Sequence, residues 1–228
     1  RDVAPSRGLG DVYKRQILLF CLLGISCMLK AADKPIIKIE TDCTSLIFQV
    51  GDNGRLYQRY LGKKLNHESD FAYLPQGTEV YITHGAEDYF EPAIQVLHND
   101  GNPSLLLKYV EHSSSRQNDG SVETVITLKD DKYPVTVKLH YITYTAENII
   151  KTFTEINHQE KKPVVLSKYA SSMLHLNRDK YFLTEFSGDW AHEVNIAERE
   201  LAFGKKTIDT KLGARANMFV SPFFQLSL

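Results

Sequence analysis

The stretch from Thr83 to Val96 combines residue types that can do chemistry with a pattern that should hold them off a sheet. Gly85 permits backbone conformations that other residues resist, and Pro92 cannot donate to a sheet ladder, so the segment between them is predicted to be a loop. Carboxylates accept hydrogen bonds from hydroxyl groups, and an aromatic ring offers a flat apolar face, a combination that suits a sugar. The side chains presented in this way are Glu87, Asp88, Tyr89 and Glu91. A solvated loop without a ligand is the alternative.

Two further arrangements could carry chemistry. Asp88 and Glu91 are paired carboxylates, but glycoside hydrolysis needs a defined carboxyl separation, about 5 Å for retention, and a loop leaves that separation unconstrained. The only tryptophan, Trp190, follows Ser187-Gly188-Asp189, which predicts a turn. The turn would place its indole at a sheet rim, where it could stack on a sugar or seal an interface, and packing in the core is the alternative.

Other chemistries find no support in the residue spacing. The eight histidines form no His-x-His or His-x-x-x-His pair, and there is no Cys-x-x-Cys, so no metal site and no cofactor are predicted. A Gly-x-Ser-x-Gly elbow and a phosphate-binding loop are also missing. The net charge of −1 and the absence of long basic runs argue against binding to nucleic acid.

The elements that must position the loop are strands. Hydrophobic residues recur with a period of two from Pro35 onward, and the residues 133–143 place Val135, Val137, Leu139 and Tyr141 on one face. Glu79 to Thr83 and Ala93 to His98 are the predicted strands on either side of the loop, and 51–54 is a predicted hairpin turn. About a dozen strands and no convincing amphipathic helix predict an all-β fold, a large antiparallel β-sandwich without a linker between Pro35 and Thr210.

The N-terminal part predicts export. Residues 1–16 carry no hydrophobic periodicity and are interpreted as a non-native leader, and residues 17–32 as a signal peptide with an apolar core of twelve residues. Lipidation at Cys27 is the alternative to cleavage near Ala31 and Ala32, and the destination is the periplasm or the outside of the cell. Cys43 would then be the only cysteine of the mature part, which excludes an internal disulfide. The β-sandwich domain is expected to span residues 33–228, and the final apolar strand at Phe223 to Leu228 indicates a truncated chain.

Three segments together resemble a known family. They are Gly85-Ala86-Glu87-Asp88-Tyr89-Phe90-Glu91-Pro92-Ala93 with Val96 and His98, Ser187-Gly188-Asp189-Trp190-Ala191-His192-Glu193, and Gly213-Ala214 followed by Ser221-Pro222-Phe223-Phe224. In order and spacing this set is similar to the N-terminal domain of bacterial α-galactosidases of glycoside hydrolase family 36. Phe90 stands where an arginine is common, and Arg215 to Met218 replace a Ser-Ser-His run.

The resemblance implies a β-supersandwich in front of a catalytic (β/α)8 barrel. The parent enzyme would hydrolyse terminal α-galactosides such as melibiose and raffinose with retention, through two aspartates of the barrel. Those aspartates would lie beyond Leu228, so the resemblance implies no catalytic residue in this chain and no activity for it alone. It also implies a tetramer in which the loop is donated to a neighbour's active site, with Asp88 as the main substrate contact and Tyr89 and Trp190 behind it. A free-standing carbohydrate-binding module or adhesin is the alternative function.

Overall fold

The structure, a computed structural model, describes residues 34–86, 90–177, 180–209 and 219–228. The expected leader at 1–16 and the expected signal peptide at 17–32 lie outside the described residues, and so do Asp88 and Tyr89. Within the described part of the chain, no helix is long and apolar enough to cross a membrane.

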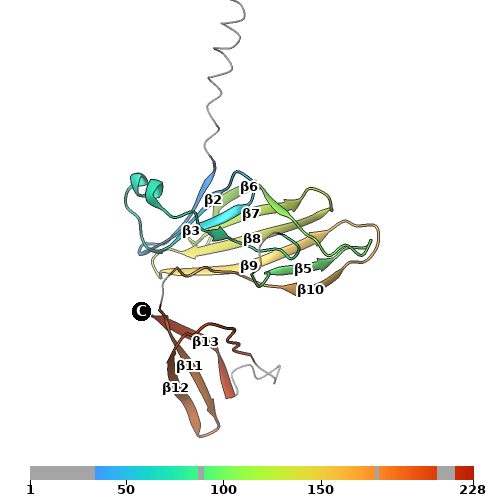
Figure 1. Cartoon of the computed structure of the whole chain (residues 1–228). Helices are drawn as coiled ribbons and strands as arrows, with labels where there is room; N and C mark the ends of the chain where they lie inside the picture. The colour runs from blue at the N-terminus through green and yellow to red at the C-terminus, as the bar shows by residue number, and fades with distance from the viewer. Residues whose placement is uncertain (1–33, 87–89, 178–179, 210–218) are drawn as a thin grey trace, which may run out of the picture. The chain divides into compact units, whose positions relative to one another are not determined.

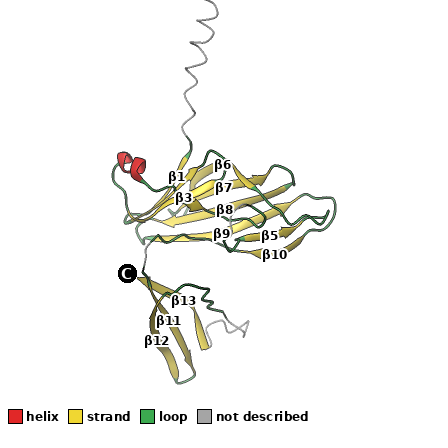
Figure 2. Cartoon of the chain, viewed as in Figure 1, coloured by secondary structure: helices red, strands yellow, loops and turns green. Residues whose placement is uncertain are grey.

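The fold is all-β with antiparallel sheets, which confirms the predicted class (Figure 1). The helical element is a short 3-10 helix, η1 (Glu68–Tyr73), drawn in red in Figure 2. The strands are β1 (Ile36–Glu40), β2 (Thr44–Val50), β3 (Leu56–Lys63), β4 (Thr78–Glu79), β5 (Ile94–Leu97), β6 (Leu107–Arg116), β7 (Val122–Asp130), β8 (Val135–Tyr144), β9 (Ile149–His158), β10 (Val165–Tyr169), β11 (Phe182–Asp189), β12 (His192–Glu200) and β13 (Phe219–Ser227).

Contacts divide the chain into two compact units, Arg1–His175 and Leu176–Leu228. We call the first the sandwich unit and the second the three-stranded unit. The sandwich unit contains a sheet of order β1-β2-β3-β4, a sheet of order β6-β7-β8-β9 and a ribbon formed by β5 and β10. The three-stranded unit is a sheet of order β12-β11-β13. The sequence shows no linker at the boundary between the two units, and the division was not predicted.

The core lies in the sandwich unit, between its two four-stranded sheets. The alternation in β8 is as predicted: Val135, Val137, Leu139 and Tyr141 are all at most 4 % exposed. From the facing sheet, Phe48 of β2 packs on Tyr141 with ring centroids 5.1 Å apart. Interdigitation of two inner faces is the usual way in which antiparallel sheets form a sandwich core.

The strand boundaries differ from the predicted ones at two places. The serine-rich segment from His112 to Ser121 predicts a loop after a strand at Leu105 to Glu111. β6 instead continues through the serines at 113–115, because these residues pair with β7 along an exposed edge where polar side chains are tolerated. The predicted strand from Glu79 to Thr83 is only the two-residue β4, followed by a single bridge between Thr83 and Ile94.

Candidate functional site

Hydrogen bonds fix both ends of the loop that was predicted to present the candidate residues. On the N-terminal side, Thr83 Oγ1 donates to the carbonyl of Leu105 at 2.6 Å, and the His84 amide donates to the carbonyl of Ile94 at 3.0 Å. On the C-terminal side, the Ala93 amide donates to the carbonyl of Ile82 at 2.7 Å. The two ends of the loop are therefore held beside each other by backbone and buried side-chain hydrogen bonds.

Gly85 is required by the geometry at the start of this loop. Its φ is +81°, and a Cβ there would lie 2.7 Å from the Cα of Ser104. A side chain at position 85 would thus meet both backbone strain and a backbone atom that cannot move aside cheaply. The prediction that Gly85 serves the turn is confirmed.

Of the side chains predicted to be presented, Glu91 lies within the described residues. Its carboxylate forms an ion pair with Lys168 of β10 and is therefore engaged with the scaffold. Its neighbour Phe90 is 69 % exposed. The structure does not bring Asp88 and Tyr89 together with any other candidate, because they lie outside the described residues.

A hollow of about 480 Å³ lies at the base of the loop. Gly85 and Ala86 line it together with charged and polar residues that the sequence did not single out, among them Lys108 and Tyr133. Asp130 is also in the lining, but its carboxylate accepts from the amides of Leu106, Lys132 and Tyr133 at 2.6 to 2.8 Å. Asp130 therefore closes a turn and is not poised for chemistry. No periodic pattern could have shown this hollow, because its walls come from four separate turns and strands.

A buried pair next to the loop stabilises the end of β5. His98 Nδ1 lies 2.7 Å from Glu160 Oε1, Nε2 lies 3.0 Å from the carbonyl oxygen of Ser104, and the ring stacks on Tyr133 at 3.5 Å. Burial alone would raise the pKa of Glu160, but hydrogen bonds from His98 and Asn99 outweigh it and hold the pKa below its usual value. His98 is thus a buried residue with partners at both ring nitrogens.

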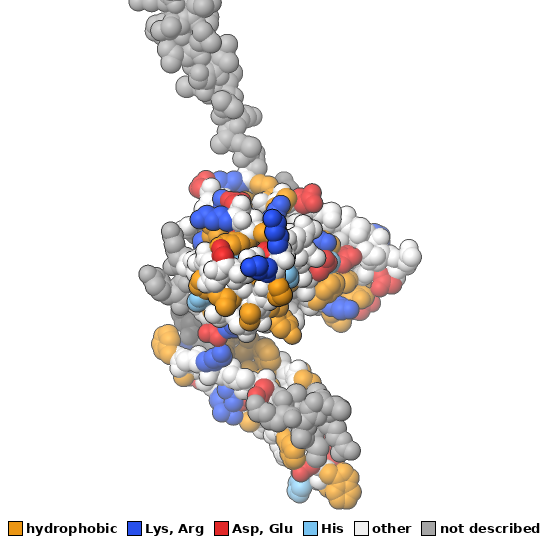
Figure 3. Space-filling view, turned by 90° about the vertical axis from the view of Figure 1, so that its right-hand side faces the viewer, with side chains coloured by type: hydrophobic (Ala, Val, Ile, Leu, Met, Phe, Trp, Pro, Cys, Tyr) orange, Lys and Arg blue, Asp and Glu red, His pale blue; other side chains and the backbone are white. Residues whose placement is uncertain are grey.

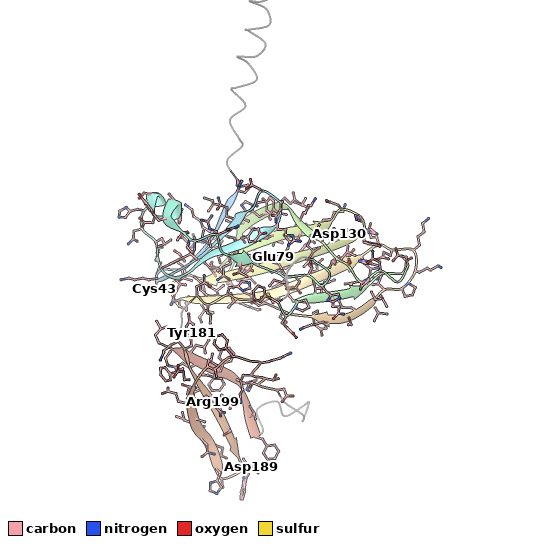
Figure 4. All side chains as sticks on the ribbon, viewed as in Figure 1. Cys43, Glu79, Asp130, Tyr181, Asp189 and Arg199 are labelled. Atoms are coloured by element: carbon pink, nitrogen blue, oxygen red, sulfur yellow. The ribbon has the colours of Figure 1, made fainter. Side chains whose placement is uncertain are left out.

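Trp190 belongs to the other unit. It occupies the two-residue turn between β11 and β12, where Ala191 has a φ of +65°, and its side chain is 89 % exposed. Asp189, labelled in Figure 4, accepts a hydrogen bond from the Trp190 amide at 2.7 Å. The predicted position at a turn is confirmed, and packing in the core is excluded. The loop lies in one unit and Trp190 in the other, so each is positioned by its own scaffold.

The described residues contain no metal centre. No group of three or more His, Cys, Asp or Glu within them has the geometry to hold a metal ion. The exposed Cys43 has no disulfide partner in the part of the chain that the structure describes. The described chain thus provides one β-scaffold that fixes both ends of the candidate loop and a second β-scaffold that exposes an aromatic side chain.

Comparison with known proteins names the family. The model of the glycosyl hydrolase family 36 N-terminal domain matches residues 54–227, and the chain belongs to this family as its N-terminal domain. The α-galactosidase Mel36A of Lactobacillus acidophilus is 21 % identical in an alignment 217 residues long, which covers 80 % of this chain and 30 % of the relative.

Solved structures agree with the fold. The α-galactosidase of Lactobacillus brevis superposes with a TM-score of 0.75 at 22 % identity, over 86 % of this chain and 31 % of that one. A variant of the α-galactosidase AgaA of Geobacillus stearothermophilus in complex with raffinose superposes with a TM-score of 0.76 at 20 % identity, over 84 % and 31 %. The chain therefore spans less than a third of the length of these relatives.

Proposed function

We propose that this chain is the non-catalytic N-terminal β-sandwich of an exported α-galactosidase that hydrolyses terminal α-D-galactosides of the melibiose and raffinose type with retention. The observation that carries the proposal is the family match over residues 54–227. It is supported by the relatives, which are α-galactosidases, one of them crystallised with raffinose. The catalytic residues would belong to a (β/α)8 barrel outside this chain, and export would follow from the segment at 17–32.

The role of the domain would be to contact the substrate without performing the chemistry. A barrel active site opens at the ends of its strands and is shaped by whatever covers them, so a pinned loop of a neighbouring domain is able to line it. In the sequence, Asp88 and Tyr89 lie between Thr83 and Ala93, whose hydrogen bonds fix the two ends of the predicted loop. We assign Asp88 the contact to galactose hydroxyls, with Tyr89 and Trp190 as aromatic contacts, in a homotetramer where the loop reaches a neighbouring subunit.

The test is Asp88→Ala in the complete enzyme, assayed with melibiose and raffinose. Loss of a charge-assisted hydrogen bond costs about 1.5–3 kcal/mol, so kcat/KM is expected to fall about ten- to a hundredfold. Glu147→Ala, which removes an exposed carboxylate from the turn before β9, is the control and should leave kcat/KM unchanged. Equal kinetics for Asp88→Ala and the parent would overturn the role of the loop, and an enzyme without α-galactosidase activity would overturn the proposed function.

One observation favours the second candidate, a carbohydrate-binding module or adhesin. Trp190 is exposed at the tip of a hairpin, as expected for a side chain that stacks on a sugar. Because it is the only tryptophan, its fluorescence reports binding directly. Raffinose binding by the chain alone, with loss of binding in Trp190→Ala and no barrel in the complete gene product, would establish this candidate in place of the first.

A further inference from the structure

The outer face of the first sheet of the sandwich unit carries two adjoining hollows with volumes of about 500 and 670 Å³. Both are lined by Gln49 of β2 and Arg59 of β3, so they adjoin at these two side chains. We call the two hollows together the β2–β3 groove. Besides Gln49 and Arg59, the polar and aromatic residues that line the β2–β3 groove include Lys34, Asp52, Asn53, Tyr57, Gln76 and Phe71.

One wall of the groove is fixed by Arg59. The connection from η1 to β4 crosses this face, and the guanidinium donates to the carbonyl of Leu74 at 2.5 Å, to the carbonyl of Pro75 and to Gln49 Oε1. Gly77 ends the crossing with a φ of +81° and approaches so closely that a Cβ would lie 2.1 Å from the carbonyl oxygen of Gln58. The wall is thus built into the sheet, and three of the five N–H groups of Arg59 are used to build it.

The ring of Tyr57 is held from two sides on the floor of the first hollow. Its hydroxyl accepts from Asn53 Nδ2 at 2.7 Å, and a Cβ at Gly51 would lie 2.7 Å from Tyr57 Cε2. Gly51 therefore lets the ring lie against the hairpin backbone. Tyr57 and Gln49 are direct partners across β2 and β3, which places their side chains next to each other on the same face.

The groups left over in the groove match a polyhydroxylated ligand. The hydroxyl hydrogen of Tyr57 and two N–H groups of Arg59 remain to donate, and within the described chain the Gln76 side chain has no hydrogen-bond partner. Amides both donate and accept, and Asp52, 93 % exposed and paired with Lys34, adds acceptors at the rim. The second hollow continues the groove with the ring of Phe71, over which Lys38 Nζ lies at 4.5 Å.

We propose that the β2–β3 groove binds a neutral oligosaccharide, with one sugar ring stacked on Tyr57 and the next directed past Arg59 toward Phe71. Mixed donors and acceptors around an aromatic face favour hydroxyl groups. Of the cations in the lining, Lys34 is paired with Asp52, and Arg59 already donates to two carbonyl oxygens and to Gln49, so these two charges are not left to an anionic ligand. The proposal uses none of the loop residues at 85–92 and does not depend on the α-galactosidase activity proposed above.

The experiment is a two-dimensional amide NMR titration of the chain with raffinose. Saturable shifts are expected for the backbone amides around Gly51 and Asn53 and for the side-chain amides of Gln49 and Gln76. Tyr57→Ala should weaken binding by about tenfold, and Gln76→Ala by a smaller factor without touching the sheet. Tyr169→Ala, which removes a 67 % exposed tyrosine of β10, is the matched control and should change nothing.

Several outcomes would overturn the inference. They are the absence of saturable shifts at these amides, shifts that persist unchanged in both Tyr57→Ala and Gln76→Ala, and shifts produced by inorganic phosphate but not by raffinose. If Tyr57→Ala fails to fold, Gln76→Ala and Tyr57→Phe, which keeps the ring and loses the hydroxyl, decide the question. Failure here leaves the kinetics of Asp88→Ala unaffected, so the two proposals are tested separately.

Discussion

The two units solve the problem of stability in different ways. The sandwich unit buries nineteen hydrophobic residues in one cluster that joins both of its four-stranded sheets. In the three-stranded unit, Leu183, 4 % exposed, is the one hydrophobic residue among those described that is buried, and every residue of β12 is exposed. Figure 3 shows hydrophobic side chains at the surface of this unit, interspersed with charged ones. Ile196 and Phe223 are 66 % and 54 % exposed.

The two units differ in what determines their folded structure. A two-layer sandwich buries the inner face of each sheet against the other and is specified by its own sequence. Among the described residues, the three-stranded sheet has no second layer of its own. Strand pairing, the stacked rings of Phe186 and Phe223 and ion pairs must therefore hold it. Such a sheet presents apolar area suited to contacts with other parts of a protein.

The largest expected effect comes from removing a core ring. Phe48 is fully buried and packs on Tyr141, so Phe48→Ala should lower the unfolding free energy of the sandwich unit by about 4–5 kcal/mol. Leu183→Ala is the matched change in the other unit and should cost less, about 2 kcal/mol, because its sheet has only one layer to disturb. Hydrogen exchange of β8 and β11, measured by mass spectrometry, reports each unit separately. Equal losses of unfolding free energy for the two substitutions would show that the three-stranded unit depends on its buried residue as strongly as the sandwich unit does.

The second prediction contrasts a buried ion pair with an exposed one. Arg55 Nη1 and Glu79 Oε2 are 3.2 Å apart with side chains only 10 % and 5 % exposed, so Arg55→Met leaves a buried carboxylate and should cost about 3 kcal/mol. In the three-stranded unit, Glu185 is 12 % exposed and pairs at 3.0 Å with Arg199, whose side chain is 55 % exposed. Glu185 also pairs with Lys206 at 3.0 Å, so its carboxylate keeps a cation when Arg199 is replaced. Arg199, labelled in Figure 4, should therefore tolerate Arg199→Met with a loss of about 0–1 kcal/mol.

Urea denaturation followed by circular dichroism measures both losses. Raising the salt concentration should diminish the small effect of Arg199→Met and leave the large effect of Arg55→Met in place, because buried pairs are screened less. A loss for Arg199→Met as large as that for Arg55→Met would show that the three-stranded unit depends on its charges as strongly as the sandwich unit does.

The third prediction separates backbone strain from steric conflict within the sandwich unit. Gly77 and Gly101 both have positive φ, at +81° and +86°, but a Cβ at Gly101 meets nothing within 4 Å. Gly101→Ala should thus cost only the conformational penalty of about 1 kcal/mol, whereas Gly77→Ala adds the clash with the carbonyl of Gln58 and should cost about 2 kcal/mol. Thermal melts of the two variants give the difference. A smaller loss for Gly77→Ala would show that the crossing from η1 to β4 is not fixed as described.

Local sequence patterns predict most of the fold but little of the candidate site. The alternation of Val135, Val137, Leu139 and Tyr141 fixes which face of β8 is buried, and the turn chemistry of 51–54 fixes the β2–β3 hairpin, so both were predictable. The short β4 was not, because pairing there depends on the distant β3. The extension of β6 was missed for the same reason: its serines are strand residues only because β7 pairs with them.

For the candidate site, the sequence identified the turn that exposes Trp190 and the need for Gly85. It did not reveal the pairing of Glu91 with Lys168, which joins residues 77 positions apart. Nor did it reveal the β2–β3 groove, whose wall comes from a loop that crosses the sheet. Long-range contacts of this kind leave no periodic signal, so a single sequence contains no trace of them.

The smallest predicted effect concerns pH and the last residue of the sandwich unit. His175 Nε2 donates to the carbonyl of Glu79 at 2.7 Å, and Gln58 exchanges hydrogen bonds with the backbone of His175. Burial lowers the pKa of His175 below 6.5, and the hydrogen bond to Glu79 only partly opposes this. As the pH falls through 6.5, the unfolded chain takes up a proton at this imidazole while the folded chain does not, so the unfolding free energy decreases. The decrease ends at the lower pKa of the folded state.

His175→Gln should flatten this part of the pH dependence of unfolding, measured by urea titrations at a series of pH values from above 6.5 downward. Leu174→Ala is the control, because it changes an exposed neighbour without removing a titrating group. If the slope is the same in His175→Gln and in the parent chain, the buried imidazole does not contribute. If the slope disappears, protonation at His175 weakens the sandwich unit at the residue where the chain passes to the three-stranded unit, and acid should loosen this boundary before it reaches the core around Phe48.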